Sequence, residues 1–375
     1  MTISEIEAKS ILRKHKRIDP WFISRYGMNL YRGCHHNCTY CDGRSEDYYV
    51  EGDFGRDVGV KVNAPEILRR ELDPKRKRIP LKRSFVLMGG GVGDSYQPVE
   101  NDYELSKQIL RVIHEYHFPV HVLTKSILVK RDVDILKKIN RETRAIVSFS
   151  FSSVDEKISA IFEPGVPSPA ERLEAMAFFK NEGIACGMFL MPVIPFITDM
   201  PALIESAVKM AKEVGADFIN FGGMTLKEGN QKQLFFESIQ QHYPELMPEY
   251  LTIYRDDKWG TPSDAYSTSV HQIFNIVTQR YGMPKRVPLS LFSEVLDEND
   301  RVVIILEHMD YLLKLRGQKT PFGYAAYAIS QVKEPLSSQR LKLRNLKGVG
   351  NVTERTILEI LDTGSAAYYK ELMGP

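Results

Sequence analysis

The sequence predicts an α/β fold on a parallel sheet, either a partial barrel or a doubly wound sheet, with a smaller appendage behind it. Short β-rich runs alternate with helical patterns as far as Phe221, and glycine or polar residues follow several of these runs. The 375 residues are 43% apolar and 26% charged, which excludes disordered and low-complexity classes. Strands that are each followed by a helix should be parallel, with right-handed crossovers.

The predicted elements follow from these runs in order. Strands are expected at Gly27–Tyr31, Ser84–Gly89, Pro119–Thr124, Arg144–Phe151, Ile184–Met191 and Ala216–Phe221. Helices are expected at Pro65–Leu72, Glu100–Tyr116, Arg131–Asn140, Pro169–Asn181 and Met200–Val214. The fourth helix has the clearest start, because Ser168 supplies an N-cap, Pro169 the first helical position and Glu171 the acid of a capping box.

Length suggests one large α/β domain with a smaller appendage. We expect an N-terminal arm at 1–25, the α/β domain at 26–230, a mainly helical extension at 231–335 and a hairpin module at 336–375. The N-terminus mixes acids and bases without an apolar stretch, and the longest apolar run is interrupted by prolines. The sequence therefore predicts a cytoplasmic protein without a membrane segment.

Three of the four cysteines are clustered as Cys34-x3-Cys38-x2-Cys41, whereas Cys186 stands alone. A structural zinc site usually has four ligands. Here the fourth would be His35 or His36, whose neighbouring positions in the chain make a tetrahedral arrangement difficult. A cubane iron–sulfur cluster normally takes four thiolates. With only three, one iron keeps an open position for the amine and carboxylate of a small ligand.

The cysteine cluster resembles the radical S-adenosylmethionine superfamily, in which C-x3-C-x2-C carries an aromatic residue, here Tyr40, before the last cysteine. Further stretches of the sequence resemble, more specifically, the branch containing spore photoproduct lyase and its uncharacterised relatives. These stretches are YRGCHHNCTYCDGR, GDSYQPVE, LTKS, FEPGVPSPAERLEAM and MPVIPFITD. The resemblance implies a partial (β/α)6 TIM-like barrel, a [4Fe-4S] cluster, S-adenosylmethionine, and an electron donor such as a flavodoxin or ferredoxin.

The resemblance also assigns residues. It implies that Cys34, Cys38 and Cys41 hold the cluster. It implies that Tyr40 lies against the adenine, that Gly89, Gly90 and Gly91 meet the methionine amine, that Lys125 neutralises the methionine carboxylate, and that Ser148 or Ser150 bonds the ribose. The lyase returns hydrogen from a cysteine after its second strand, and 88–94 of this chain contains none. Tyr40, Tyr96 and Tyr31 remain as candidate relays, because Cys186 is expected to be a small buried apolar residue.

A second motif stands near the C-terminus, where Leu346–Leu358 fits a helix-hairpin-helix pattern with Ser337–Asn345 as its first helix. Its glycines allow a tight turn, and amides at the start of the second helix can hold a phosphate. From Lys314 to Arg355 there are nine bases against two acids. The candidate nucleic-acid contacts are Lys347, Gly348, Gly350, Thr353 and Arg355.

Two functional hypotheses follow. The first is an enzyme that generates a 5′-deoxyadenosyl radical and abstracts hydrogen from a nucleic-acid substrate in DNA lesion repair or modification. The alternative is an enzyme of the same superfamily acting on a peptide or small molecule, with the hairpin serving protein assembly. A DNA-binding protein with a purely structural cluster fits less well, because three thiolates leave one iron open.

Overall fold

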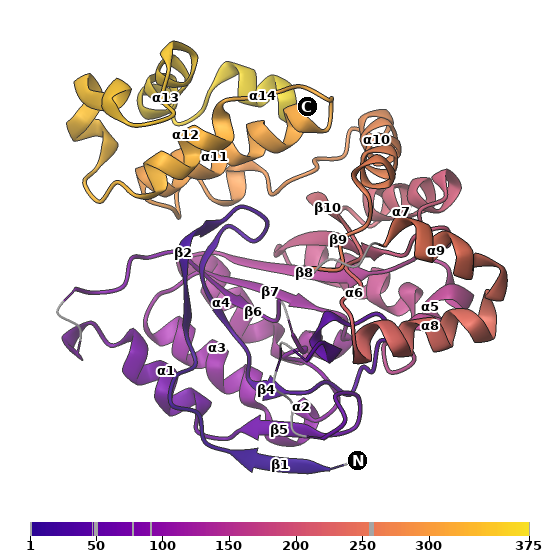
Figure 1. The fold of residues 1–375 in the computed structure, drawn as a ribbon. Helices are drawn as coiled ribbons and strands as arrows, with labels where there is room; N and C mark the ends of the chain where they lie inside the picture. Colours follow the sequence, from indigo (N-terminus) through magenta and orange to yellow (C-terminus); the bar gives the residue numbers. More distant parts are fainter. Residues whose placement is uncertain are drawn as a thin grey trace.

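A curled, seven-stranded sheet forms the centre of the molecule in the computed structural model, which describes residues 2–46, 48, 52–76, 79–90, 92–254 and 259–374 (Figure 1). Its order is β10-β9-β8-β7-β6-β3-β2. The strands are β2 (Arg13–Asp19), β3 (Ser24–Met28), β6 (Phe85–Met88), β7 (Val120–Thr124), β8 (Ala145–Phe151), β9 (Ala185–Val193) and β10 (Phe218–Gly223). All neighbours pair in parallel except β2 with β3. The predicted partial barrel of six parallel strands is confirmed.

The helices between the strands cover one face of this sheet, where Val86, Val120 and Val147 belong to the same apolar cluster as helix residues. They are α1 (Ala64–Leu72), α2 (Glu100–Tyr103), α3 (Leu105–Glu115), α4 (Val133–Glu142), α5 (Glu156–Phe162), α6 (Pro169–Asn181) and α7 (Pro201–Glu213). The helix predicted at 100–116 is divided, because Glu104 adopts a φ of 46°. The capping box of α6 is present as predicted.

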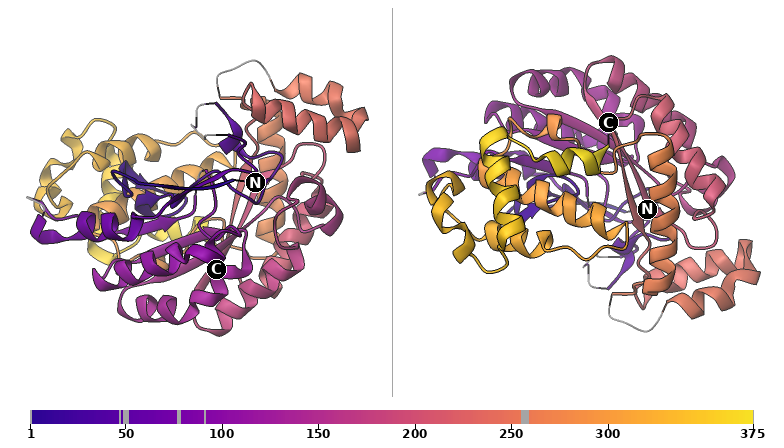
Figure 2. Two further views of the ribbon diagram at one scale, coloured as in Figure 1. Left: turned by 90° about the horizontal axis from the view of Figure 1, so that it is seen from below. Right: turned by 90° about the horizontal axis from the view of Figure 1, so that it is seen from above.

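The mainly helical extension is also confirmed, and part of it covers the opposite face of the sheet (Figure 2). Its helices are α8 (Asn230–His242), α9 (Met247–Ile253), α10 (Asp264–Arg280), α11 (Glu298–Lys314) and α12 (Phe322–Ser330), and the module after it adds α13 (Asn351–Thr363) and α14 (Ala367–Met373). One apolar cluster joins Phe85, Leu87 and Phe189 to residues from Val287 to Leu372. Because side chains alternate along a strand, this cluster and the first occupy opposite faces.

The N-terminal arm contains strands that the sequence did not predict. β1 (Ile3–Ile6), β5 (Val58–Lys61) and β4 (Tyr31–Arg32) form a separate three-stranded sheet, and β2 is the edge of the main sheet. β3 ends at Met28 rather than Tyr31, so the predicted bounds of the first strand were shifted. The sequence of β2 lacks the apolar pattern that would predict a strand, because it is mostly charged and only Ile18 of its seven residues is fully buried.

The predicted hairpin module differs from two α-helices joined by a turn. Its first segment, Leu336–Asn345, is 3₁₀ and is interrupted at Gln339, whose φ is −121°. Gly348 has the positive φ, 91°, that the tight turn requires, and α13 follows from Asn351. No helix in the described ranges combines the length and apolarity that crossing a membrane would demand.

Candidate active site

A cavity of about 350 Å³ lies where the parallel strands end at their carboxyl termini. Tyr40 and Lys125 line it together with Ser150 at the end of β8. All three cluster cysteines and Gly90 also line it. The fold therefore brings most of the predicted site residues to the edge where α/β barrels carry their chemistry.

The cysteines occupy a loop that follows β4 and is held by buried amides. Gln97 is fully buried; its Oε1 accepts from His35 N at 2.9 Å and its Nε2 donates to Gly33 O at 3.1 Å. Gln231 Nε2, from α8, donates to Tyr40 O at 2.9 Å. Neither glutamine was predicted, although Gln97 lies in the GDSYQPVE phrase.

The three cluster cysteines are free of disulfides and largely withdrawn from solvent. Burial, with a smaller contribution from Glu163, raises the pKa of Cys38 to about 12, and burial raises the pKa of Cys34 and Cys41. Among the described residues, no three His, Cys, Asp or Glu side chains converge to hold one metal ion. A cluster does not require such convergence, because each thiolate binds a different iron. Three thiols lining one cavity fit that donor set.

A buried charge network stands behind Tyr40 and Lys125. The Glu163 carboxylate forms ion pairs with Arg172, at 2.7 Å, and with Lys125, at 3.1 Å, and it accepts a hydrogen bond from the Tyr40 hydroxyl. Lys125 Nζ also donates to Ser150 Oγ at 2.9 Å. Burial opposes ionisation of Glu163, but the two cations outweigh it and hold its pKa well below the ordinary range.

A second buried acid, Asp94, connects the glycine segment to the end of β7. It accepts from Lys125 N at 2.7 Å and from Thr124 Oγ1 at 2.8 Å, and His36 Nε2 lies 3.2 Å from its carboxylate. Burial opposes ionisation of Asp94, but His36 and the backbone donors lower its pKa. This carboxylate fixes the backbone from which the Lys125 side chain extends into the cavity.

The glycine segment before Asp94 has space for backbone only. Gly89 has a φ of 74°, and a Cβ there would lie 2.1 Å from Leu123 O. Gly90 has a φ of 142° and lines the cavity. Gly91 lies outside the described residues. The two described glycines therefore form a close backbone approach that a larger residue would block.

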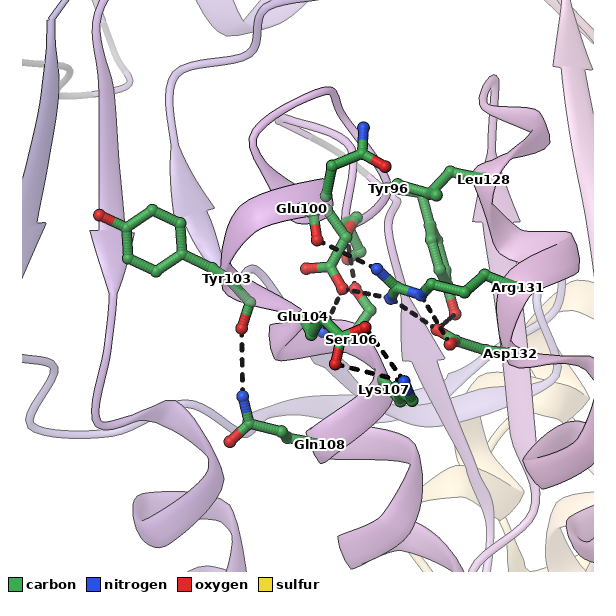
Figure 3. A network of polar contacts seen from close by, with 12 residues as sticks. Tyr96, Glu100, Tyr103, Glu104, Ser106, Lys107, Gln108, Leu128, Arg131 and Asp132 are labelled. Atoms are coloured by element: carbon green, nitrogen blue, oxygen red, sulfur yellow. Dashed lines mark hydrogen bonds and ion pairs between the residues drawn. The ribbon is translucent and has the colours of Figure 1, made fainter.

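Several predicted residues of the barrel, Gly89 among them, lie outside the cavity lining. Ser148 is fully buried and its hydroxyl bonds His121 Nε2 at 2.8 Å. Tyr96 donates to Asp132 at 3.1 Å, within a polar network that includes Glu100 and Arg131 (Figure 3). Cys186 is fully buried beside Val147, which confirms its interpretation as a small core residue.

The five candidate nucleic-acid contacts belong to the C-terminal module. Lys347, Gly348, Gly350 and Arg355 are exposed. Thr353 is buried instead, and its hydroxyl accepts from Gly350 N at 2.8 Å, which caps α13. Its side chain is therefore used within the module.

Residues 28–207 match the family model described as the radical SAM superfamily. An uncharacterised protein of Methanocaldococcus jannaschii is 31% identical over 245 residues, which cover 64% of this chain and 86% of that protein. An uncharacterised protein of Mycobacterium tuberculosis is 29% identical over 269 residues, covering 70% and 76%. Among solved structures, spore photoproduct lyase complexed with dinucleoside spore photoproduct superimposes with a TM-score of 0.55, at 16% identity, covering 75% and 79% of the two chains.

Proposed function

Because the chain belongs to the radical SAM superfamily, and is therefore an enzyme that uses a [4Fe-4S] cluster and S-adenosylmethionine, we propose that it abstracts hydrogen from a nucleic-acid substrate in DNA lesion repair or modification. The observation that carries this proposal furthest is the cavity that gathers three free cysteines, Lys125 and Ser150 at the carboxyl edge of the sheet. Enzymes of this superfamily need an electron donor, for which we propose a flavodoxin or ferredoxin.

Different residues around the cavity would bind different parts of the cluster and of S-adenosylmethionine. Cys34, Cys38 and Cys41 would hold three irons of the cluster. Gly90 would accept the methionine amine through its backbone, Lys125 would pair with the methionine carboxylate, Ser150 would bond the ribose and Tyr40 would lie against the adenine. When bound, the cluster and S-adenosylmethionine supply a 5′-deoxyadenosyl radical that takes a hydrogen atom from the substrate. Tyr40, which lines the cavity, is a better placed relay for hydrogen return than Tyr96.

Two observations support the nucleic-acid substrate. The fold is similar to that of spore photoproduct lyase, which is complexed in one solved structure with a dinucleoside photoproduct. The tail from Lys314 to Arg355 has a large excess of bases, and Lys347 and Arg355 are exposed at the hairpin. Exposed cations next to a helix start suit phosphate contacts that are independent of sequence.

The cofactor assignment is tested by anaerobic reconstitution of the full chain. We expect about four irons and four sulfides per chain, and release of 5′-deoxyadenosine when dithionite and S-adenosylmethionine are added. Cys34→Ala, Cys38→Ala or Cys41→Ala should abolish the release, whereas Cys186→Ala should leave it nearly intact. Loss of release in Cys186→Ala alone would contradict the placement of that residue outside the site.

The substrate assignment is tested with point variants, because Leu336 and Ile357 belong to the core and a truncated tail would expose it. A fluorescent DNA duplex is titrated against the wild type and Lys347→Ala/Arg355→Ala at several salt concentrations. Two lost phosphate contacts should reduce the log–log salt slope by about 1.8. Lys209→Ala/Lys212→Ala on α7 is the control. If the wild type binds neither DNA nor RNA, the peptide or small-molecule alternative replaces this proposal.

A further inference from the structure

The edge strand β2 carries a concentrated positive charge that the cofactor site does not use. It begins Arg-Lys-His-Lys-Arg, and Arg13, Lys14, Lys16 and Arg17 are exposed. Of these four cations, Arg17 forms an ion pair with Glu307 of α11 at 2.7 Å. A row of exposed cations along a sheet edge can prevent edge-to-edge pairing, but it is also a track for a polyanion.

The register of β2 shows which parts of the molecule this charge connects. Arg13 pairs with Gly27 near the carboxyl end of β3, the edge of the sheet at which the cavity opens. Asp19 pairs with Ser24 at the opposite end. α11 and α12 both contact β2, and Figure 1 shows the strand running along the side of the sheet toward the C-terminal helices. The basic strand therefore extends from the edge of the sheet at which the cavity opens toward helices α11 and α12 of the extension.

Helix α12, which contacts this strand, carries exposed aromatic rings. Tyr324 and Tyr327 are 78% and 60% exposed and, three residues apart, lie on one face of the helix. The opposite face is buried in the core through Phe322, Ala325, Ala326 and Ile329. The hairpin approaches closely as well, since a Cβ on Gly348 would lie 3.2 Å from Tyr324 Cβ. The two exposed tyrosines thus stand on a helix that contacts both the hairpin and the basic strand.

We propose that β2 and α12 form one face that binds an unpaired strand of nucleic acid, with its phosphates on Arg13, Lys14 and Lys16 and its bases stacked on Tyr324 and Tyr327. Cations that follow a backbone and aromatic rings that stack bases are the two components of single-strand recognition. A paired base offers only its edge to a protein, so the tyrosines favour an unpaired strand over a duplex. This inference rests on the proposed function, because it specifies the form of the nucleic acid delivered to the cavity.

The test measures binding of a fluorescein-labelled 20-nucleotide single strand, and of the matching duplex, to full-length reconstituted protein. Lys14→Glu/Lys16→Glu should weaken single-strand binding by about ten-fold or more and reduce its salt dependence. Tyr324→Ala/Tyr327→Ala should weaken single-strand binding by about ten-fold or more and change duplex binding little, whereas Tyr324→Phe/Tyr327→Phe should retain it. Cleavage of S-adenosylmethionine without substrate should be unchanged in every variant.

Matched controls separate this face from general charge and surface effects. Lys209→Glu/Lys212→Glu changes the charge equally on α7, and Tyr368→Ala removes an exposed tyrosine from α14. If the β2 variant binds no worse than the α7 variant, the cations only protect the sheet edge and the inference is wrong. It is also overturned if the tyrosine variants bind the single strand as well as Tyr368→Ala. If wild-type protein binds neither strand nor duplex, the proposed function itself fails.

Discussion

At the scale of single residues, Glu163 determines how charge is arranged behind the cavity. Its carboxylate is completely buried between Arg172, which is equally buried, and Lys125, which reaches the cavity. Two cations and one carboxylate leave one net positive charge, and it belongs to the side chain that faces the cavity. A ligand carboxylate can therefore bind Lys125 without leaving Glu163 unpaired, since Arg172 remains beside it.

We expect Glu163→Gln to destabilise the fold by about 3 to 5 kcal/mol, because it leaves the buried Arg172 charge without an acid. Urea unfolding of the purified variant measures this loss. Glu174→Gln, an exposed change on α6, should lie within about 0.5 kcal/mol of the wild type. Equal stability of the two variants would show that the Glu163 carboxylate is not needed in the core.

Lys125→Ala should weaken S-adenosylmethionine binding by roughly 10- to 150-fold without loss of the cluster, since one charge-assisted hydrogen bond contributes about 1.5 to 3 kcal/mol. Calorimetry gives the affinity and the visible spectrum reports the cluster. Lys130→Ala, whose amine lies over Phe178 instead, is the control. An unchanged affinity would mean that Lys125 serves only as a partner of Glu163.

At the scale of elements, the hairpin before α13 depends on one backbone conformation. Gly348 and Gly364, which stand before and after α13, both have positive φ, 91° and 78°. A Cβ at Gly348 would lie 3.2 Å from Tyr324 Cβ, whereas a Cβ at Gly364 would meet nothing within 4 Å. Substituting each glycine in turn therefore distinguishes two effects. Both sites would acquire the strain of a left-handed residue, but only Gly348 would also have a close contact that could change the shape of the hairpin.

Gly348→Ala and Gly364→Ala should each cost about 1 to 2 kcal/mol of stability, the price of a left-handed alanine. Only Gly348→Ala should also weaken duplex binding, because its side chain would press on Tyr324 and displace the turn. Thermal unfolding and fluorescence anisotropy measure the two effects. If Gly364→Ala weakens binding equally, loss of helix stability rather than turn geometry is responsible.

At the scale of the whole molecule, two buried histidines tie the sheet to the helical extension and the N-terminal loop. His121 on β7 bonds Phe22 O and Ser148, and its burial lowers its pKa to about 4. His308 on α11 bonds Pro20 O and the Tyr369 hydroxyl, and burial, reinforced by Arg286, lowers its pKa to about 3. Both side chains stay neutral in the folded state at pH values where the unfolded chain is protonated.

Stability should therefore fall as the pH drops below about 6.5, where unfolded histidine takes up a proton that the folded chain does not bind. Between pH 7 and pH 5 each histidine should contribute a loss of about 2 kcal/mol. Urea unfolding at both values tests this, and His308→Gln should remove about half of the combined loss. His242→Gln, an exposed change on α8, should leave the loss unchanged. An undiminished loss in His308→Gln would contradict the assignment.

The sequence by itself determined the alternation of strands and helices, the start of α6 at its capping box and the cysteine cluster, since these depend on neighbouring residues. It also indicated Lys125, Ser150 and the described glycines by their places after strands. It could not distinguish Ser148 from Ser150, which share one face of β8, because only packing against His121 decides which one is covered. Nor could the sequence show that Tyr96 is not free to act as a relay, because its hydroxyl bonds Asp132, which only the fold brings beside it.

Only the tertiary structure revealed the network of Glu163 with Arg172 and the amides of Gln97 and Gln231. Arg172 is only nine residues from Glu163, but Tyr40 is 123 residues from Glu163 and 191 from Gln231, so no local pattern reveals these contacts. The same holds for β2, whose charged sequence indicates no strand and becomes one only because β3 offers it an edge. Local residue chemistry sets the elements and the cluster ligands, whereas long-range burial decides which charges are paired and which face the cavity.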